Sequence, residues 1–187
     1  MTEVLAFGDA AAWEAWLADH HTRQGGVWLK LAKKGSGLAS VTPAEALDVA
    51  LYYGWIDGQR KALDERHYLQ KYTPRRPRST WSKVNVDKAE ALMAAGRMRA
   101  PGLAAIEVAK ADGRWAAAYG PARTATVPPD LAAALEQDER ARRFYASLGR
   151  SDRYLVILRL ETARTPEARA ARLRRMVATL AAGRRVR

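Results

Sequence analysis

The sequence predicts an α+β fold, in which a small antiparallel sheet packs on helices and is followed by a C-terminal helical bundle. Two segments with alternating polar and apolar residues, 55–63 and 67–72, flank a polar turn and are typical of paired strands. Apolar residues at helical spacing precede and follow them. Beyond Val127-Pro128-Pro129-Asp130, every element that the patterns indicate is a helix.

The first part of the chain alternates helix and strand signals. Asp9 is suited to cap a helix whose stripe consists of Trp13, Trp16, Leu17 and His20. Two glycines then precede a short predicted strand at 27–31, which leads into the basic, glycine-rich turn 33–37. Thr42-Pro43-Ala44-Glu45 is a capping box with proline at the first helical position, so we expect a second helix directly after it.

Prolines and glycines delimit the remaining predicted elements. Pro74 ends the second strand of the pair, Asn85 is suited to cap a helix that Gly96 closes, and Pro101 opens a helix that ends near residue 113. Four more helices are predicted at about 130–136, 138–148, 152–163 and 166–182. We therefore expect an α+β domain over residues 1–126 and a helical region over residues 127–187.

The composition favours a basic globular protein without thiol chemistry. The 187 residues carry a formal charge of +12, which favours anionic partners such as nucleic acid, anionic lipid head groups or phosphorylated ligands. An arginine-rich genome would raise the charge in the same way without any partner. There is no cysteine, no basic and apolar leader at the N-terminus, and no apolar run long enough to span a bilayer. We therefore expect a cytoplasmic protein that does not insert into membranes.

Templates for enzymes and metal sites match this sequence poorly. Ser36 lies between two glycines, but no base follows at a spacing known for nucleophilic catalysis. The histidines at positions 20, 21 and 67 form no zinc-binding pattern, and His20 is expected to be a half-buried core residue. Glu45 belongs to a helix cap, and the acids at 64 and 65 belong to a turn. We therefore predict no catalytic residues, no metal and no cofactor.

The basic segment 54–86 is the best candidate for a binding site. It contains eight lysines or arginines and three acids, interleaved with aromatic residues. Prolines near the arginines limit backbone freedom, and each guanidinium offers bidentate geometry to phosphate or carboxylate. Aromatic rings would add flat surfaces, on which each stacked base contributes about 1–3 kcal/mol. The predicted ligand-binding residues are Trp55, Asp57, Arg60, Lys61, Lys71, Tyr72, Arg75, Arg76, Arg78, Ser79, Trp81, Ser82, Lys83 and Arg169.

Two members of this set have a structural alternative. Asp57 either contacts a ligand or orients Arg75 or Arg76, in which case the segment is a self-satisfied cluster of arginine, tryptophan and aspartate. Arg169 projects onto the apolar stripe of the last helix, which consists of Leu173, Met176, Val177 and Leu180. A buried guanidinium is retained when it is paired or binds an anion, so Arg169 either meets a carboxylate of the core or reaches a ligand.

Several blocks along the chain resemble a known family. They are Ala12-Trp13 to Trp16-Leu17, Gly26-Val27-Trp28-Leu29, Gly54-Trp55-Ile56-Asp57-Gly58, Tyr72-Thr73-Pro74-Arg75-Arg76-Pro77, Trp81-Ser82-Lys83-Val84-Asn85, Gly113-Arg114-Trp115 and Thr165-Pro166-Glu167 with Arg169. In these blocks the chain resembles, over nearly its full length, the bacterial YdeI/OmpD-associated family of bacteriocin-protection proteins. The resemblance implies an accessory stress-response role in tolerating bacteriocins or cationic antimicrobial peptides, with an outer-membrane porin as a type of partner for some members. It implies no catalytic residues.

Three functional hypotheses follow from these observations. The first is a tolerance protein that binds an anionic small molecule or protein partner over Arg75, Arg76, Arg78 and Lys83. Because a net charge of +12 repels cationic peptides, direct sequestration of the antimicrobial is not expected. The second is a nucleic-acid-binding module that uses the same basic strip and shows a steep salt dependence. The third is an enzyme on a small phosphorylated or nucleotide-like substrate, with a pocket in which Arg169 converges on Asp57.

Overall fold

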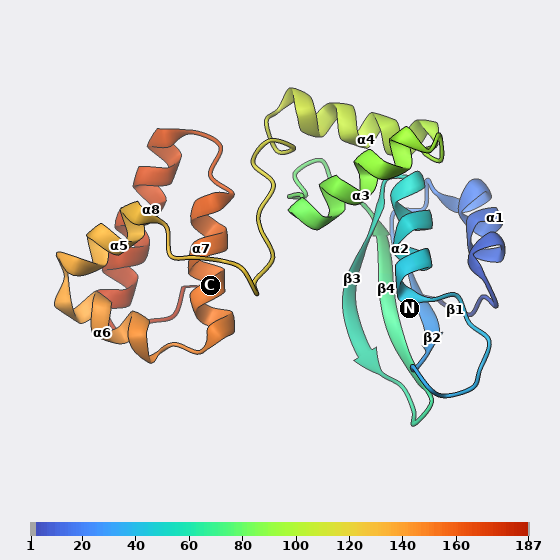
Figure 1. The fold of residues 1–187 in the computed structure, drawn as a ribbon, viewed down its shortest axis with the longest axis horizontal. Coiled ribbons are helices and arrows are strands. Elements are labelled where there is room, and N and C mark those ends of the chain that lie inside the picture. Colours follow the sequence, from blue (N-terminus) through green and yellow to red (C-terminus); the bar gives the residue numbers. More distant parts are fainter. Residues whose placement is uncertain (1–2, 187) are drawn as a thin grey trace. The chain divides into compact units, whose positions relative to one another are not determined.

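The computed structural model describes residues 3–186, and their secondary structure confirms the α+β class. The chain divides into two compact units (Figure 1). The first unit comprises the residues up to Ser79 together with Asp87–Ala109. The second unit comprises Thr80–Val86 and the residues from Lys110 on.

A four-stranded sheet forms the centre of the first unit. Its strands are β1 (Val4–Leu5), β2 (Val27–Ala32), β3 (Trp55–Ala62) and β4 (His67–Pro74), in the order β1-β2-β4-β3. The β1–β2 pair is parallel and the other pairs are antiparallel, with Trp28 opposite Lys71. An irregularity between Asp57 and Arg60 shifts the register of the β3–β4 hairpin. The predicted hairpin is therefore confirmed, whereas β1 was not predicted.

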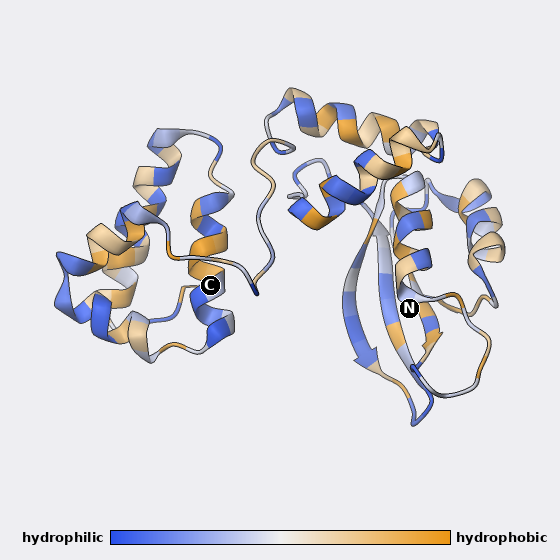
Figure 2. Cartoon of the chain, viewed as in Figure 1, coloured by the Kyte–Doolittle hydropathy of each residue, from blue (hydrophilic) through white to orange (hydrophobic). Residues whose placement is uncertain are grey.

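Helices α1 (Ala10–His20) and α2 (Pro43–Tyr52) pack on one face of this sheet. Their apolar residues join those of β2, β3 and β4 in one core. In Figure 2, β2 carries hydrophobic residues, whereas most of β3 is hydrophilic. The fully buried large side chains of this core include Trp13, Leu17, Leu29, Leu31, Trp55 and Tyr72.

Side-chain caps explain where the first two helices begin. The Asp9 carboxylate accepts a hydrogen bond from the Ala12 amide (2.9 Å). At α2, the Glu45 amide donates to the Thr42 hydroxyl (3.3 Å) and the Thr42 amide donates to the Glu45 carboxylate (2.9 Å). This confirms the predicted capping box, and the hydrogen bonds from Thr42 hold the pKa of Glu45 below its ordinary value.

Two further helices follow the hairpin. Helix α3 (Lys83–Ala94) begins in the second unit and ends in the first, and α4 (Ala100–Ala111) follows it. The Ser82 hydroxyl, not the predicted Asn85 side chain, receives the capping hydrogen bond, which comes from the Asn85 amide (3.2 Å). The helix therefore begins three residues earlier than expected, because a serine directly before its first turn is already an efficient cap.

The second unit contains a helical bundle. Its helices are α5 (Pro129–Glu136), α6 (Glu139–Ser147), α7 (Arg150–Glu161) and α8 (Pro166–Ala181), each close to the predicted bounds. Asp138 and Thr165 cap α6 and α8 with side-chain hydrogen bonds. The core of the bundle includes Leu131, Leu135, Val156, Ile157, Leu160, Met176 and Leu180.

Candidate functional site

The three aromatic residues of the predicted site are core residues. Trp55 is fully buried, and its indole nitrogen donates to the His21 carbonyl (2.8 Å). Tyr72 is 1% exposed, and burial, followed by the negative charge of Asp57, raises the pKa of its hydroxyl. Trp81 is 2% exposed and packs edge-on against Trp115, with ring centroids 4.7 Å apart. None of these rings therefore offers an exposed face to a base or a sugar.

The arginine-rich turn after β4 is ordered by backbone and hydroxyl hydrogen bonds. The Ser79 hydroxyl accepts from the Arg76 amide (3.0 Å), and the Ser79 amide donates to the Arg76 carbonyl (2.9 Å). The Arg75 amide donates to the Gly54 carbonyl (2.9 Å), and its side chain is half-buried. Arg76 and Arg78 are exposed, so a partner can reach both guanidinium groups.

The predicted set is divided between the two units. Trp81, Ser82 and Lys83 belong to the second unit, where the Lys83 amide donates to the Tyr119 carbonyl (2.8 Å) and its side chain is exposed. Ser82 serves as the cap of α3. The residues from Trp55 to Ser79 belong to the first unit.

Asp57 lies close to two of the predicted cations. Burial of its carboxylate raises its pKa, while its own backbone hydrogen bond and the charges of Arg75 and Arg60 lower it. The residue as a whole is solvent-exposed, so water limits the effect of burial on the pKa, and the positive charges of the two arginines act on the carboxylate. This proximity favours the structural alternative, in which Asp57 orients Arg75.

Arg169 is held inside the second unit by an acid that the sequence did not indicate. Its guanidinium makes a bidentate contact with Asp130 (2.7 and 2.9 Å) and donates to the Leu160 carbonyl (3.0 Å). The hydrogen bond from Arg169 is the main reason why the pKa of Asp130 is lowered. Arg169 therefore forms an ion pair with Asp130 inside the bundle. The enzyme hypothesis had predicted that Arg169 converges on Asp57 instead.

A surface of lysines covers the face of the sheet opposite α1 and α2. The ammonium groups of Lys61 and Lys71 lie over the Trp28 ring, 4.5 and 5.9 Å from its centroid. Lys30 lies two residues after Trp28 and therefore points to the same face. None of the strand residues on this face is acidic. We call Lys30, Lys61 and Lys71, together with Trp28 beneath Lys61 and Lys71, the lysine face.

Sequence reasoning found only half of the lysine face. Lys61 and Lys71 were predicted as ligand-binding residues, whereas Trp28 and Lys30 were not. The available signal was the alternation along β2, which directs Val27, Leu29 and Leu31 to the core and leaves Trp28 and Lys30 on the other side.

A cavity of about 660 Å³ lies beside the glycine-rich loop in the same unit. It is lined by residues 32–38 and 40–43 together with Arg60 and Tyr68. The Arg60 side chain lies over the Tyr68 ring (4.5 Å), and its Nε donates to the Gln70 side-chain oxygen (3.0 Å). Both the cationic loop and Arg60 border this cavity, but Arg60 is already engaged by its neighbours.

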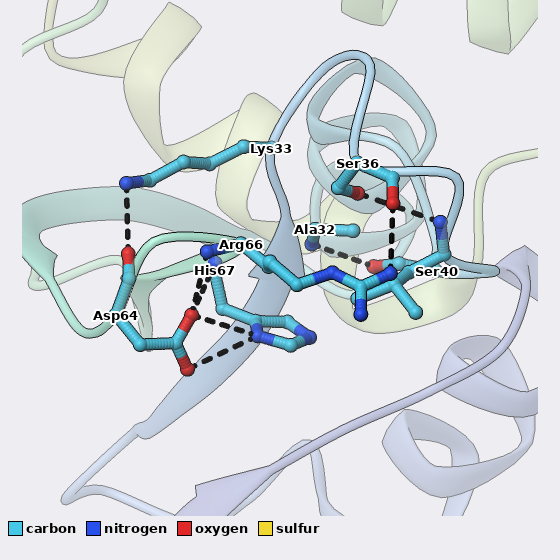
Figure 3. A network of polar contacts seen from close by, with 8 residues as sticks. Ala32, Lys33, Ser36, Ser40, Asp64, Arg66 and His67 are labelled. Atoms are coloured by element: carbon cyan, nitrogen blue, oxygen red, sulfur yellow. Dashed lines mark hydrogen bonds and ion pairs between the residues drawn. The ribbon is translucent and has the colours of Figure 1, made fainter.

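A polar network fixes this loop to the turn of the β3–β4 hairpin (Figure 3). Lys33 donates to the Asp64 carbonyl (2.8 Å), and Arg66 donates to the Ser36 carbonyl (2.9 Å). The Asp64 carboxylate accepts hydrogen bonds from the backbone amides of Arg66 and His67, which hold its pKa below its ordinary value. These hydrogen bonds hold the loop in place, and Lys33 makes one of them, so its ammonium group already has a partner within the fold.

The described residues contain no group of three side chains suited to hold a metal ion. His20 is exposed, not half-buried, and stacks on Trp16 with ring centroids 4.3 Å apart. Within residues 3–186 no helix is both long and apolar enough to cross a membrane. The compartment in which the protein works stays a prediction.

These features define a basic α+β protein with a helical C-terminal region and a surface of lysines on its sheet that form no ion pair with any residue of 3–186. A family model described as a domain of unknown function, DUF8412, matches residues 5–105, which is more than half of the chain. The chain therefore belongs to this family. The lysine face, the glycine-rich loop and the arginine-rich turn all lie within the matched residues.

A second family model, described as "Bacteriocin-protection, YdeI or OmpD-Associated", matches residues 124–183. This match confirms the predicted family resemblance for the C-terminal region and relates that region to bacteriocin protection. The GWIDG and TPRRP blocks, on which the resemblance also rested, fall within the match to the other family. No curated protein and no solved structure matches the chain.

Proposed function

We propose that the protein is a non-enzymatic accessory protein of bacteriocin or antimicrobial-peptide tolerance, which acts by binding an acidic segment of a protein partner through the lysine face. Two observations of different kinds support the proposal. The family description of residues 124–183 supports the role in protection. The lysine face supports the mode of action, and it is the observation that carries the proposal.

The charge of the lysine face is not balanced within the sheet. Several other basic side chains of the first unit have acidic partners, such as Arg23 with Glu3 and Lys88 with Asp48. Among residues 3–186, Lys30, Lys61 and Lys71 form no ion pair, and two of their ammonium groups share one tryptophan ring. Like charges on adjacent strands repel each other, and an anionic partner would relieve this repulsion.

A protein partner fits this face better than a single-stranded nucleic acid. Single-stranded nucleic acids bind to exposed aromatic rings on which bases stack. Trp28 is 8% exposed under its two lysines, and the other candidate rings are buried. The carboxylates of an acidic protein segment, in contrast, can bind to the lysine ammonium groups without any exposed aromatic ring. The words "OmpD-Associated" in the family description also favour a protein partner, and a porin of the outer membrane is one candidate.

The decisive experiment compares two triple variants with equal charge. K30Q/K61Q/K71Q removes the lysine face, and R23Q/R97Q/R99Q removes three ion-paired cations of the same unit, so each lowers the formal charge from +12 to +9. Binding of a polyglutamate peptide is measured by calorimetry at low salt. We expect the first variant to bind at least about tenfold more weakly and the second to bind within about twofold of the unaltered protein.

The same variants test the biological role. Bacteria that lack the gene are complemented with each variant and challenged with a bacteriocin. Loss of survival with K30Q/K61Q/K71Q alone supports the proposal. Equal survival with both variants would reject the lysine face as the site of action. If single-stranded DNA binds more tightly than polyglutamate and depends on the same lysines, the nucleic-acid hypothesis replaces the present one.

A further inference from the structure

A second basic site lies in the helical bundle, in a cavity of about 490 Å³ between α7 and α8. Its lining residues are Arg159, Thr162, Arg172, Arg175, Met176, Thr179 and Val186. Three of these seven residues are arginines, and none is acidic. Arg159 lies in the last turn of α7, and Thr162 is the residue that caps the C-terminal end of this helix. On α8, Arg172 and Arg175 are three residues apart and therefore lie on one face of the helix.

Arg172 is fixed in place by the end of α7. Its Nη1 donates to the Arg159 carbonyl (2.8 Å) and to the Thr162 hydroxyl (3.3 Å). The Thr162 hydroxyl in turn donates to the Leu158 carbonyl (2.8 Å). These contacts cap the negative end of α7 and hold the guanidinium in one orientation. Binding an anion would therefore require little further ordering of Arg172.

Helix capping does not explain the other two arginines. Elsewhere in the bundle, Arg169 pairs with Asp130, Arg143 with Glu139 and Arg185 with Asp152. Within the part of the chain that the structure describes, Arg159, Arg172 and Arg175 have no ion pair. Three unbalanced guanidinium groups around one cavity repel each other, and this cost is compensated when an anion binds among them.

We infer that this cavity binds a phosphoryl group. Phosphate oxygens accept bidentate hydrogen bonds from guanidinium groups, and a dianion balances more of the three positive charges than a carboxylate does. Both threonine hydroxyls already donate to backbone carbonyls, so the arginines would supply the donors. Met176 and Val186 give the cavity an apolar part, which suits an organic group attached to the phosphate. This cavity lies in the second unit and would bind a phosphoryl group, whereas the lysine face lies in the first unit and would bind an acidic protein segment.

The test is calorimetric titration of the full chain with three probes at about 150 mM salt, near physiological ionic strength. The probes are inorganic phosphate, a nucleoside monophosphate, and phosphatidylcholine vesicles containing phosphatidic acid. The site variant is R159Q/R175Q, which leaves the structural contacts of Arg172 intact. The charge-matched control is R142Q/R174Q, whose two arginines are exposed and lie outside the cavity.

We expect at least one probe to bind and R159Q/R175Q to weaken its binding at least about tenfold, because each lost hydrogen bond between charged groups is strong. The control should change the affinity less than about twofold. Binding of the soluble phosphates identifies a free ligand as the source of the phosphoryl group, and binding of the vesicles alone identifies a lipid head group. Absence of binding by all three probes, or equal losses in both variants, would overturn the inference. The lysine-face variant should bind these probes normally, so the two proposals fail independently.

Discussion

At the residue scale, Arg169 shows how a charge can lie among the helices of a small bundle. The guanidinium sits on an apolar helix face and is matched by a bidentate carboxylate and one carbonyl. The sequence indicated that Arg169 points inward, because it lies four residues before Leu173 on the same stripe. It could not indicate Asp130 as the partner, because the two residues are 39 positions apart and only the packing of α5 against α8 brings them together.

Removing the acid of this pair should destabilise the bundle. We expect Asp130→Asn to lower the free energy of unfolding by about 1–2 kcal/mol at pH 7, less than for a fully buried pair because both side chains are about one-third exposed. Chemical denaturation measures this difference. Glu139→Gln, which breaks the exposed Arg143–Glu139 pair, is the control and should cost less than about 0.5 kcal/mol.

The effect of Asp130→Asn should depend on pH in a defined direction. Arg169 lowers the pKa of Asp130 in the folded protein, so the stabilisation is complete above the pKa of the unfolded chain, near 3.9. It is lost as the pH falls through the lowered pKa. The stability difference between the unaltered protein and the variant should therefore be constant near neutral pH and shrink below about pH 4. A difference that grows on acidification would contradict this assignment.

At the scale of elements, patterns among neighbouring residues predicted the helices and the hairpin correctly, whereas the face of the sheet to which each side chain points was predicted less well. The capping box of α2 and the β3–β4 hairpin are confirmed because both depend on neighbours in sequence. The aromatic residues of the basic segment were predicted to be ligand platforms, but Trp55 and Tyr72 point to the core. The strand β1 has two residues and pairs in parallel with a distant strand, so no local pattern marks it.

One glycine determines how closely α4 approaches α2. A Cβ atom at Gly102 would lie 2.3 Å from the Tyr52 carbonyl oxygen and 2.7 Å from the Leu51 carbonyl oxygen. These are backbone atoms, so the helices would have to separate. We expect Gly102→Ala to lower the free energy of unfolding by about 1–3 kcal/mol, although alanine favours helix. Thermal or chemical denaturation gives the value.

Gly8→Ala is the matched control for this substitution. Gly8 lies in the same unit, and a Cβ atom added there would have no atom within 4 Å apart from those of the residue itself and its two chain neighbours. The stability of this variant should stay within about 0.5 kcal/mol of that of the unaltered protein. If Gly102→Ala is equally harmless, the α2–α4 contact is less close than the structure indicates.

At the scale of the whole molecule, charge limits how the protein can protect a cell. The formal charge is +12, and each unit has a surface or cavity with unbalanced cations. Such a molecule attracts anions over a distance of about one Debye length, near 8 Å at physiological salt, and repels cationic peptides. Protection by direct capture of a cationic bacteriocin is therefore physically unfavourable.

This argument yields a prediction for the antimicrobial itself. A cationic bacteriocin should show no binding to the protein in calorimetry at about 50 mM salt, and lowering the salt further should not produce binding, because reduced screening strengthens repulsion. Polyglutamate of similar length should bind under the same conditions and weaken as salt increases. Tight binding of the cationic peptide would show that attraction through apolar contacts outweighs the charge, and the lysine face would then no longer explain protection. Weak or absent binding leaves an anionic partner as the route by which a basic protein reduces the damage done by a basic peptide.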